Sequence, residues 1–205
     1  MNPIDVSLAI DKDGWCSALQ QPACANFDAR PEGAEISLLV IHNISLPPGE
    51  FGGGYIQALF ANTLDCDAHP YFGQLRGMRV SAHFLIQRDG SAFQFVSTLD
   101  RAWHAGVSEF RGRPRCNDFS IGIELEGADD QFFCDAQYKI LAVLTQALAV
   151  RHPLTDVIGH QHIAPDRKTD PGPCFDWARF RQEFSDLARD EIIRMKTPRL
   201  LQFPD

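Results

Sequence analysis

Apolar residues in the middle of the chain fall into short runs that predict β-strands. Residues 36–41 are almost continuously apolar, which is typical of a buried central strand, and this run ends at the polar pair His42 and Asn43. Residues 118–126 instead alternate between two faces. One face carries Ile121, Ile123 and Leu125, and the other carries Gly122, Glu124 and Glu126. These patterns predict two sheet strands, each carrying polar side chains that could belong to a site.

Further strands and turns follow from the same pattern. Residues 80–87 and 92–96 flank the Asp89-Gly90 pair, which is a strong signal for a β-hairpin. Residues 157–158 predict a short final strand. Polar residues at the ends of buried strands are where α/β folds tend to bind ligands.

Helical patterns lie mainly in the C-terminal third. A helix is expected from Asp135, as its cap, to about His152, and a short one over residues 55–62. Asp176 is the expected cap of the last helix, whose apolar stripe has core spacing. That stripe consists of Trp177, Phe180, Phe184 and Leu187. The chain therefore predicts a single α/β domain with a mixed central β-sheet flanked by helices.

The two ends are expected to differ from the central domain. Residues 1–35 show no clean period and predict an irregular N-terminal arm packed on the domain. We expect the domain itself to span residues 36–196 and a loosely held tail to span residues 197–205.

Composition narrows the class of protein. The 205 residues are 44% apolar and 22% charged, with a formal net charge of −8. Such an acidic chain is a poor candidate for binding nucleic acid or an anionic membrane, because phosphate binding depends on Lys and Arg. No apolar window of about 20 residues predicts a membrane span. Met1 to Ile10 contains no secretory apolar run. We therefore expect a cytoplasmic protein.

The six cysteines are scattered and form no C-x-x-C pair. In a reducing cytosol they are expected to be free thiols. A cysteine hydrolase that uses Cys174 or Cys116 with a nearby histidine remains an alternative. Inhibition by thiol alkylation and not by chelator would favour that alternative.

Residues 159–173 combine potential metal ligands with charged groups. His160, His162, Lys168 and Asp170 lie among Pro165, Pro171 and Pro173, which predict a rigid, extended, non-helical loop. Two histidines and one carboxylate on rigid segments suit a catalytic zinc site, which keeps three protein ligands and one open position. His42, His160 and Asp170 would form such a set. The alternatives are a surface loop whose charges pair locally and a structural histidine at position 42.

Five stretches of the sequence resemble the AmpD family of zinc amidases, which act on 1,6-anhydro-N-acetylmuramyl-L-alanine in bacterial cell-wall recycling. Phage lysozyme-type amidases and peptidoglycan-recognition proteins belong to the wider family, and the resemblance covers roughly residues 36–180. The stretches are residues 39–51, 80–83, 101–106, 117–127 and 159–173.

The resemblance implies roles for individual residues. His42, His160 and Asp170 match the ligands of one Zn²⁺ per chain, and His162 is an extra imidazole beside them. Glu124 matches the acidic residue that handles the attacking water, and Lys168 matches the cation that stabilises the tetrahedral intermediate.

The chemistry agrees with these roles. A positioned carboxylate can accept a proton from water, and an ammonium group can stabilise an oxyanion, so losing either group costs about 10² to 10⁴ in rate. Glu126 shares a strand face with Glu124 and competes with it for the role. Either one could be a solvent-facing strand carboxylate.

The stem peptide of a muropeptide ends in carboxylates, which arginine binds in a bidentate manner. Arg79 and Arg115 are the candidates, although each could be an ordinary surface arginine. Asn43 could hydrogen-bond the peptide. Trp103 and His104 could form a wall against the sugar, although Trp103 could also be core. His83 is expected to be structural or to orient a zinc ligand.

The sequence thus predicts a zinc amidase that cuts between the lactyl group of (anhydro)muramic acid and L-alanine. We expect a monomer whose partner is a small muropeptide. A peptidoglycan-binding module without activity is the alternative, and the presence of the three ligands, Glu124 and Lys168 argues against it.

Overall fold

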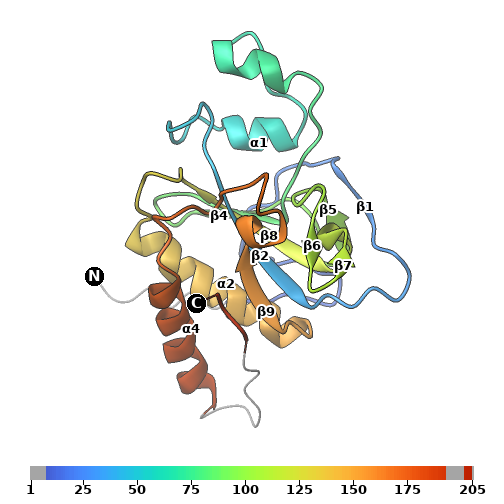
Figure 1. The fold of residues 1–205 in the computed structure, drawn as a ribbon, viewed down its shortest axis with the longest axis vertical. Coiled ribbons are helices and arrows are strands. Elements are labelled where there is room, and N and C mark those ends of the chain that lie inside the picture. Colours follow the sequence, from blue (N-terminus) through green and yellow to red (C-terminus); the bar gives the residue numbers. More distant parts are fainter. Residues whose placement is uncertain (1–7, 193–200, 205) are drawn as a thin grey trace.

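The computed structural model describes residues 8–192 and 201–204 and is built on a five-stranded mixed sheet (Figure 1). The strand order is β4-β3-β8-β2-β9. Strands β3, β8, β2 and β9 pair in parallel, and β4 pairs antiparallel with β3 at one edge. Their bounds are Phe84–Ile86 for β3, Ala92–Gln94 for β4, Leu38–Ile44 for β2, Ser120–Glu126 for β8 and Asp156–Gly159 for β9. The expected mixed α/β sheet and its hairpin are confirmed.

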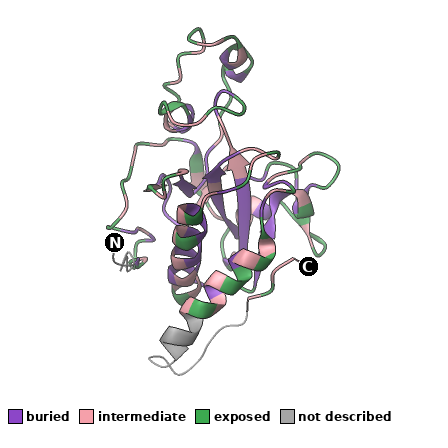
Figure 2. Cartoon of the chain, turned by 90° about the vertical axis from the view of Figure 1, so that its left-hand side faces the viewer, coloured by how far each residue is buried: buried purple, intermediate pink, exposed green. Residues whose placement is uncertain are grey.

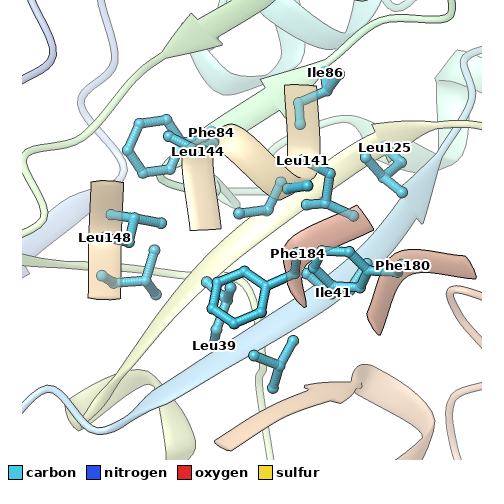
Figure 3. Close-up of a cluster of buried hydrophobic side chains, with 14 of the residues drawn as sticks. Leu39, Ile41, Phe84, Ile86, Leu125, Leu141, Leu144, Leu148, Phe180 and Phe184 are labelled. Atoms are coloured by element: carbon cyan, nitrogen blue, oxygen red, sulfur yellow. The ribbon is translucent and has the colours of Figure 1, made fainter. Parts of the chain in front are cut away.

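Helices α2 (Asp135–Arg151) and α4 (Trp177–Ile192) lie against each other and cover one face of the sheet. Their inner sides and the sheet strands are buried, and α4 keeps an exposed outer side (Figure 2). Figure 3 shows the core between them. It includes Leu39 and Ile41 from β2, Phe84 and Ile86 from β3, Leu125 from β8, Leu141, Leu144 and Leu148 from α2, and Phe180 and Phe184 from α4.

The opposite face of the sheet carries shorter elements and the polar residues. On β2, Leu39 and Ile41 point into the helical core, whereas Leu38 and Val40 belong to a cluster on the other face. By the same alternation, His42 and Glu124 face away from α2 and α4. The shorter elements around this second face are α1 (Tyr55–Phe60), β5 (Asp100–Ala102), β6 (Glu109–Phe110), β7 (Arg113–Pro114), α3 (His160–Ile163), and the 3₁₀-helices Pro70–Leu75 and Cys116–Asp118.

Two strand boundaries differ from those expected. Strand β2 does not end at His42 and continues to Ile44, because β8 extends alongside and pairs with it as far as Glu126. The strand expected over residues 80–87 shrinks to Phe84–Ile86, where both neighbours pair with it. Strand pairing, which a single run does not encode, sets both limits.

Two helix expectations are corrected. Cys134 and not Asp135 is the N-cap of α2, and Gln137 Oε1 accepts a hydrogen bond from its backbone N–H. Residues 159–173 are not wholly non-helical, because α3 occupies His160–Ile163 before the prolines. The Asp176 cap of α4 is confirmed, since its Oδ1 accepts from the Arg179 N–H at 2.9 Å.

Both chain ends are more ordered than expected where the structure describes them. Phe27–Ala29 of the arm forms strand β1, which pairs antiparallel with β5. In the tail, Gln202 pairs with Asp156 beside β9, and Phe203 packs against Phe180. Backbone pairing therefore holds segments that carry no periodic pattern. Residues 1–7, 193–200 and 205 lie outside the described residues.

No helix among residues 8–192 and 201–204 has the length and apolar character needed to cross a membrane. All six cysteines lie within these residues and are free thiols, as expected.

The buried His152 makes stability depend on pH. Burial lowers its pKa from 6.5 to about 4, and the charges of Arg151 and Arg30 act in the same direction. Between these values the unfolded chain binds a proton that the folded chain does not, so the free energy of unfolding falls as the pH falls. His152→Gln keeps a polar group near Thr98 Oγ1, which lies 2.9 Å from His152 Nε2. The variant should lose less stability than the wild type between pH of about 7 and about 4.5.

Urea unfolding of the metal-free proteins at both pH values measures this difference. Equal losses in wild type and variant would show that His152 is not the titrating group.

Candidate active site

Two imidazoles and one carboxylate converge on the polar face of the sheet. His42 Nδ1 lies 3.0 Å from His160 Nδ1 and 3.0 Å from Asp170 Oδ2, and His160 Nδ1 lies 3.1 Å from Asp170 Oδ2. Both histidines are buried and the carboxylate is partly buried. Within the described part of the chain these residues form a group able to hold a metal ion. The structure thus brings together the three predicted ligands.

Neighbouring parallel strands bring the ligands together. His42 lies on β2, and β9 beside it leads directly into α3, whose first residue is His160. The backbone N–H of Gln161 donates to the Asp170 carbonyl at 2.9 Å, which joins the segment around Asp170 to α3. Asn43 Nδ2 donates to the Pro171 carbonyl at 3.1 Å and joins the same segment to β2. Strand pairing, one backbone hydrogen bond and one side-chain hydrogen bond therefore bring together three residues that are distant in sequence.

The outer nitrogens of the two histidines also have partners. His160 Nε2 lies 3.0 Å from the Ala105 carbonyl, and His42 Nε2 lies 2.9 Å from His104 Nδ1. A carbonyl only accepts, so His160 carries its proton on Nε2 and presents a lone pair at Nδ1. Metal-binding histidines typically have such an outer partner.

The donor set suits zinc. Ligand atoms about 2.0–2.1 Å from a tetrahedral zinc ion lie roughly 3.3 Å apart, close to the 3.0–3.1 Å found between these three atoms. Burial raises the pKa of Asp170, but contacts with His160 and His42 outweigh it and leave the pKa well below its usual range. Burial lowers the pKa of His42 to about 4, so its imidazole is neutral at neutral pH. Neutral imidazoles and an ionised carboxylate are the forms that bind Zn²⁺.

Glu124 lies beside His42 and Asp170. Glu124 pairs in register with His42 across β8 and β2. Among the described residues, its Oε2 atom is buried and has no hydrogen-bond partner. Burial and the nearby Asp170 charge raise its pKa well above the usual value, and Lys168 opposes this effect.

Glu126, by contrast, has structural bonds. Its Oε1 accepts from the Gly52 N–H at 2.6 Å and its Oε2 accepts from the Arg88 N–H at 3.2 Å. A buried carboxylate oxygen without a partner is the one that can accept a proton from water. Geometry therefore favours Glu124 over Glu126.

Lys168 and His162 differ in their relation to the cluster. The charge of Lys168 lowers the pKa of both His42 and Glu124, so the ammonium group acts on the site. His162 Nδ1 instead accepts from the Gly159 N–H at 2.8 Å, and its ring lies against Trp177. His162 therefore stabilises the start of α3 and is not one of the three convergent residues.

The residues expected to contact substrate have varied surroundings. Asn43 Nδ2 donates to Asp129 Oδ1 at 2.7 Å, and Trp103 Nε1 donates to Asp28 Oδ1 at 3.2 Å. Arg79 is exposed and lines a cavity of about 210 Å³. Arg115 is exposed and pairs with Asp118.

The ring nitrogens of His104 face protein atoms, whereas a wall against the sugar would present them to the substrate. Its Nδ1 faces His42, its Nε2 lies 3.2 Å from Ser120 Oγ, and burial lowers its pKa well below the usual value. The ring also packs on the backbone of Gly122, where an added Cβ would lie 2.5 Å from His104 Cγ. Its ring nitrogens are therefore committed to the protein. His83 bonds to Gly122 N–H and the Asp100 carbonyl and is structural.

The sequence did not predict the contacts that His42 and His160 make on the side away from the cluster. Ala105, Ser120 and Asn117 take part in them, and all three lie inside stretches that carry the resemblance. Their place in those stretches indicated that they belong near the site. The contact of Ala105 could not be predicted, because its backbone carbonyl is present in every residue type.

The thiol alternative gains no support from the structure. Cys116 is buried, and burial raises the pKa of its thiol. A nucleophilic cysteine needs the opposite shift. Cys174 is partly buried beside Phe175 and is not among the residues that converge on His42.

Comparison with known proteins decides the family. A family model described as N-acetylmuramoyl-L-alanine amidase matches residues 32–173. The chain belongs to this amidase family. The amidase is 57% identical over 182 residues to 1,6-anhydro-N-acetylmuramyl-L-alanine amidase AmpD of Citrobacter freundii, which covers 88% of this chain and 97% of the relative. AmpD of Escherichia coli K12 is 56% identical over 172 residues, or 83% and 94% of the two chains.

Solved structures agree with the sequence comparison. A crystal structure of a selenomethionine AmpD derivative matches the amidase with a TM-score of 0.80 and 55% identity, over 84% of this chain and 97% of the other. A complex of the amidase AmiD from Escherichia coli with anhydro-N-acetylmuramic acid-L-Ala-D-gamma-Glu-L-Lys matches with a TM-score of 0.55 and 28% identity, over 86% and 65%. The resemblance and the fold class that the motifs predicted are both confirmed.

Proposed function

We infer that this amidase is zinc-dependent and hydrolyses the bond between the lactyl group of (1,6-anhydro)N-acetylmuramic acid and L-alanine. The convergence of His42, His160 and Asp170 beside the buried Oε2 atom of Glu124, which has no hydrogen-bond partner among the described residues, carries this inference. The activity for which the AmpD relatives are named and the muropeptide in the AmiD complex support the substrate class.

His42, His160 and Asp170 would hold the zinc ion through Nδ1, Nδ1 and Oδ2. Bound there, zinc supplies a Lewis acid that polarises a carbonyl and lowers the pKa of water to about 7. The protein keeps the His42 imidazole neutral and the Asp170 carboxylate anionic, and it buries both histidines.

Glu124 and Lys168 handle the proton and the charge. Glu124 accepts a proton from the attacking water at its free Oε2 atom and returns it to the leaving amine of L-alanine. Lys168 stabilises the negative charge that develops on the carbonyl oxygen, which is worth most in a water-poor site. The two roles need a carboxylate and an ammonium group close to each other. The charge of Lys168 lowers the pKa of Glu124, which supports this proximity.

Four residues have side chains whose chemistry suits parts of the muropeptide. Arg79 and Arg115 are exposed guanidinium groups suited to the carboxylates of the stem peptide. Asn43 would hydrogen-bond the peptide through its amide oxygen, since its Nδ2 atom bonds to protein. Trp103 offers an aromatic edge to the sugar, and the contacts of His104 support a role toward His42 in place of the sugar.

The cellular setting follows from the substrate. A soluble fragment as substrate is consistent with an enzyme of cell-wall recycling that acts as a cytoplasmic monomer on a small muropeptide, with no nucleic-acid or membrane partner. We place the catalytic domain at residues 36–196, with the arm at 1–35 and the tail at 197–205.

Mass spectrometry of muropeptide digests tests this function. The protein, with and without a zinc chelator, is incubated with matched anhydro and reducing-end muropeptides of equal stem length. We expect release of the intact stem peptide from the anhydro form, and loss of this release on chelation. A digest that proceeds unchanged in chelator, or that stops only after thiol alkylation, would reject zinc-dependent amide hydrolysis.

A further inference from the structure

One dipeptide contacts both candidate zinc-binding histidines on the side away from the metal. His104 Nδ1 lies 2.9 Å from His42 Nε2, and the Ala105 carbonyl lies 3.0 Å from His160 Nε2. Asn117 Oδ1 accepts hydrogen bonds from the backbone N–H groups of His104 and Ala105 at 3.2 and 2.8 Å. The Asn117 side chain therefore fixes the dipeptide that contacts both His42 and His160.

The direction of the hydrogen bonds along this chain of groups can be worked out from its far end. The Cys116 carbonyl only accepts, so the Ser120 hydroxyl donates to it at 2.6 Å. The Ser120 oxygen then accepts from His104 Nε2–H at 3.2 Å. This leaves His104 Nδ1 without a proton, so it accepts from His42 Nε2–H. With its proton on Nε2, His42 presents a lone pair at Nδ1 toward His160 and Asp170. Asp170 Oδ2, 3.0 Å from Nδ1, is the acceptor that competes with His104 for this proton in the metal-free protein.

We propose that His104, held by Ser120, is a positioning residue that keeps His42 in the one tautomer able to bind zinc. The metal part of this proposal rests on the proposed function. The Ala105 carbonyl acts in the same way on His160. Without such a partner, a neutral imidazole divides its proton between two nitrogens and its ring can rotate. Loss of outer partners of metal ligands typically costs 10- to 100-fold in metal affinity.

The packing around His104 supports a fixed ring. The His104 and His42 rings meet edge to face with centroids 5.0 Å apart, and the backbone of Gly122 closes the other side. The ring is therefore in contact with His42 on one side and with β8 on the other.

Substitutions of His104 and of Ser120 separate this positioning role from simple packing. His104→Phe keeps an aromatic ring and removes the acceptor, whereas His104→Asn keeps an acceptor near the position of Nδ1. Ser120→Ala removes the group that sets the His104 tautomer. His152→Asn, at another buried histidine, is the matched control.

The first readout is the dissociation constant for Zn²⁺, measured by competition with a chromogenic chelator. We expect His104→Phe to weaken zinc binding by about 10- to 100-fold, Ser120→Ala to weaken it less, and His104→Asn to restore most of it. The His152→Asn control is expected to bind zinc like the wild type. Equal affinities of His104→Phe and wild type would overturn the proposal.

The second readout is the tautomer of His42 in the metal-free protein, from long-range proton–nitrogen NMR spectra. We expect mainly the Nε2–H tautomer in wild type and in His104→Asn, and a shift toward the Nδ1–H tautomer, which Asp170 favours, in Ser120→Ala and His104→Phe. An unchanged tautomer in both latter variants would overturn the positioning role, and the Ser120→Ala result decides this even if His104→Phe does not fold. If the tautomer changes as expected while wild type binds no zinc, the positioning role stands and the proposed function fails.

Discussion

Asp170→Asn is expected to abolish measurable muropeptide hydrolysis and to release zinc from the purified protein. Asparagine keeps the shape of the side chain but removes the anion that faces His42 Nδ1 and His160 Nδ1 at 3.0 and 3.1 Å. A neutral amide is a poor zinc ligand beside two neutral imidazoles, so the remaining pair cannot complete the set of three ligands that a catalytic site needs. Zinc content per chain and stem-peptide release, measured on one preparation, report both effects.

Asp166→Asn is the matched control for this variant. It makes the same chemical change four residues earlier, at an exposed position outside the convergent group. The control should keep its zinc and its activity. An Asp170→Asn protein that retained both would remove Asp170 from the ligand set.

Glu124→Gln is expected to lower turnover by about 10² to 10⁴ while zinc stays bound. The substitution preserves the size of the side chain and removes its capacity to take a proton at the free Oε2 atom. In free energy the loss corresponds to about 2.7–5.4 kcal/mol of transition-state stabilisation. Steady-state turnover and zinc content, measured together, separate this effect from the loss of a ligand.

Glu126→Gln tests whether the effect belongs to position 124. Glu126 lies on the same strand face but accepts hydrogen bonds from the backbone N–H groups of Gly52 and Arg88. We expect this variant to lose stability in urea and to keep its turnover per folded molecule. Near-normal turnover in Glu124→Gln would show that another group takes the proton.

The strands and helices of the sheet could be predicted because each has a local signature. The alternation over residues 120–126 correctly separated the core face of β8 from the face that carries Glu124. The limits of the strands were less predictable. His42 lies inside β2 and not after it, because the length of β8 beside it decides where pairing stops.

The candidate site was predictable where residue type carries the chemistry. Histidine and carboxylate at positions 42, 160 and 170 suggested a metal site, and the resemblance to the amidases added their convergence. Contacts made by backbone groups could not be predicted, since the carbonyl of Ala105 is the same in any residue. Nor could sequence reveal that His104 contacts His42, because this depends on how β8 packs beneath the ring.

The close approach of the His104 ring to Gly122 has a consequence for reading natural variation in this protein. Position 122 carries no side chain, yet a methyl group there would lie 2.5 Å from His104 Cγ, so the ring or the strand would have to shift. A glycine-to-alanine change is usually scored as mild, and here we expect it to disturb the contact between His104 and His42. Surveys of inactive alleles that inspect only histidines and acidic residues would overlook it.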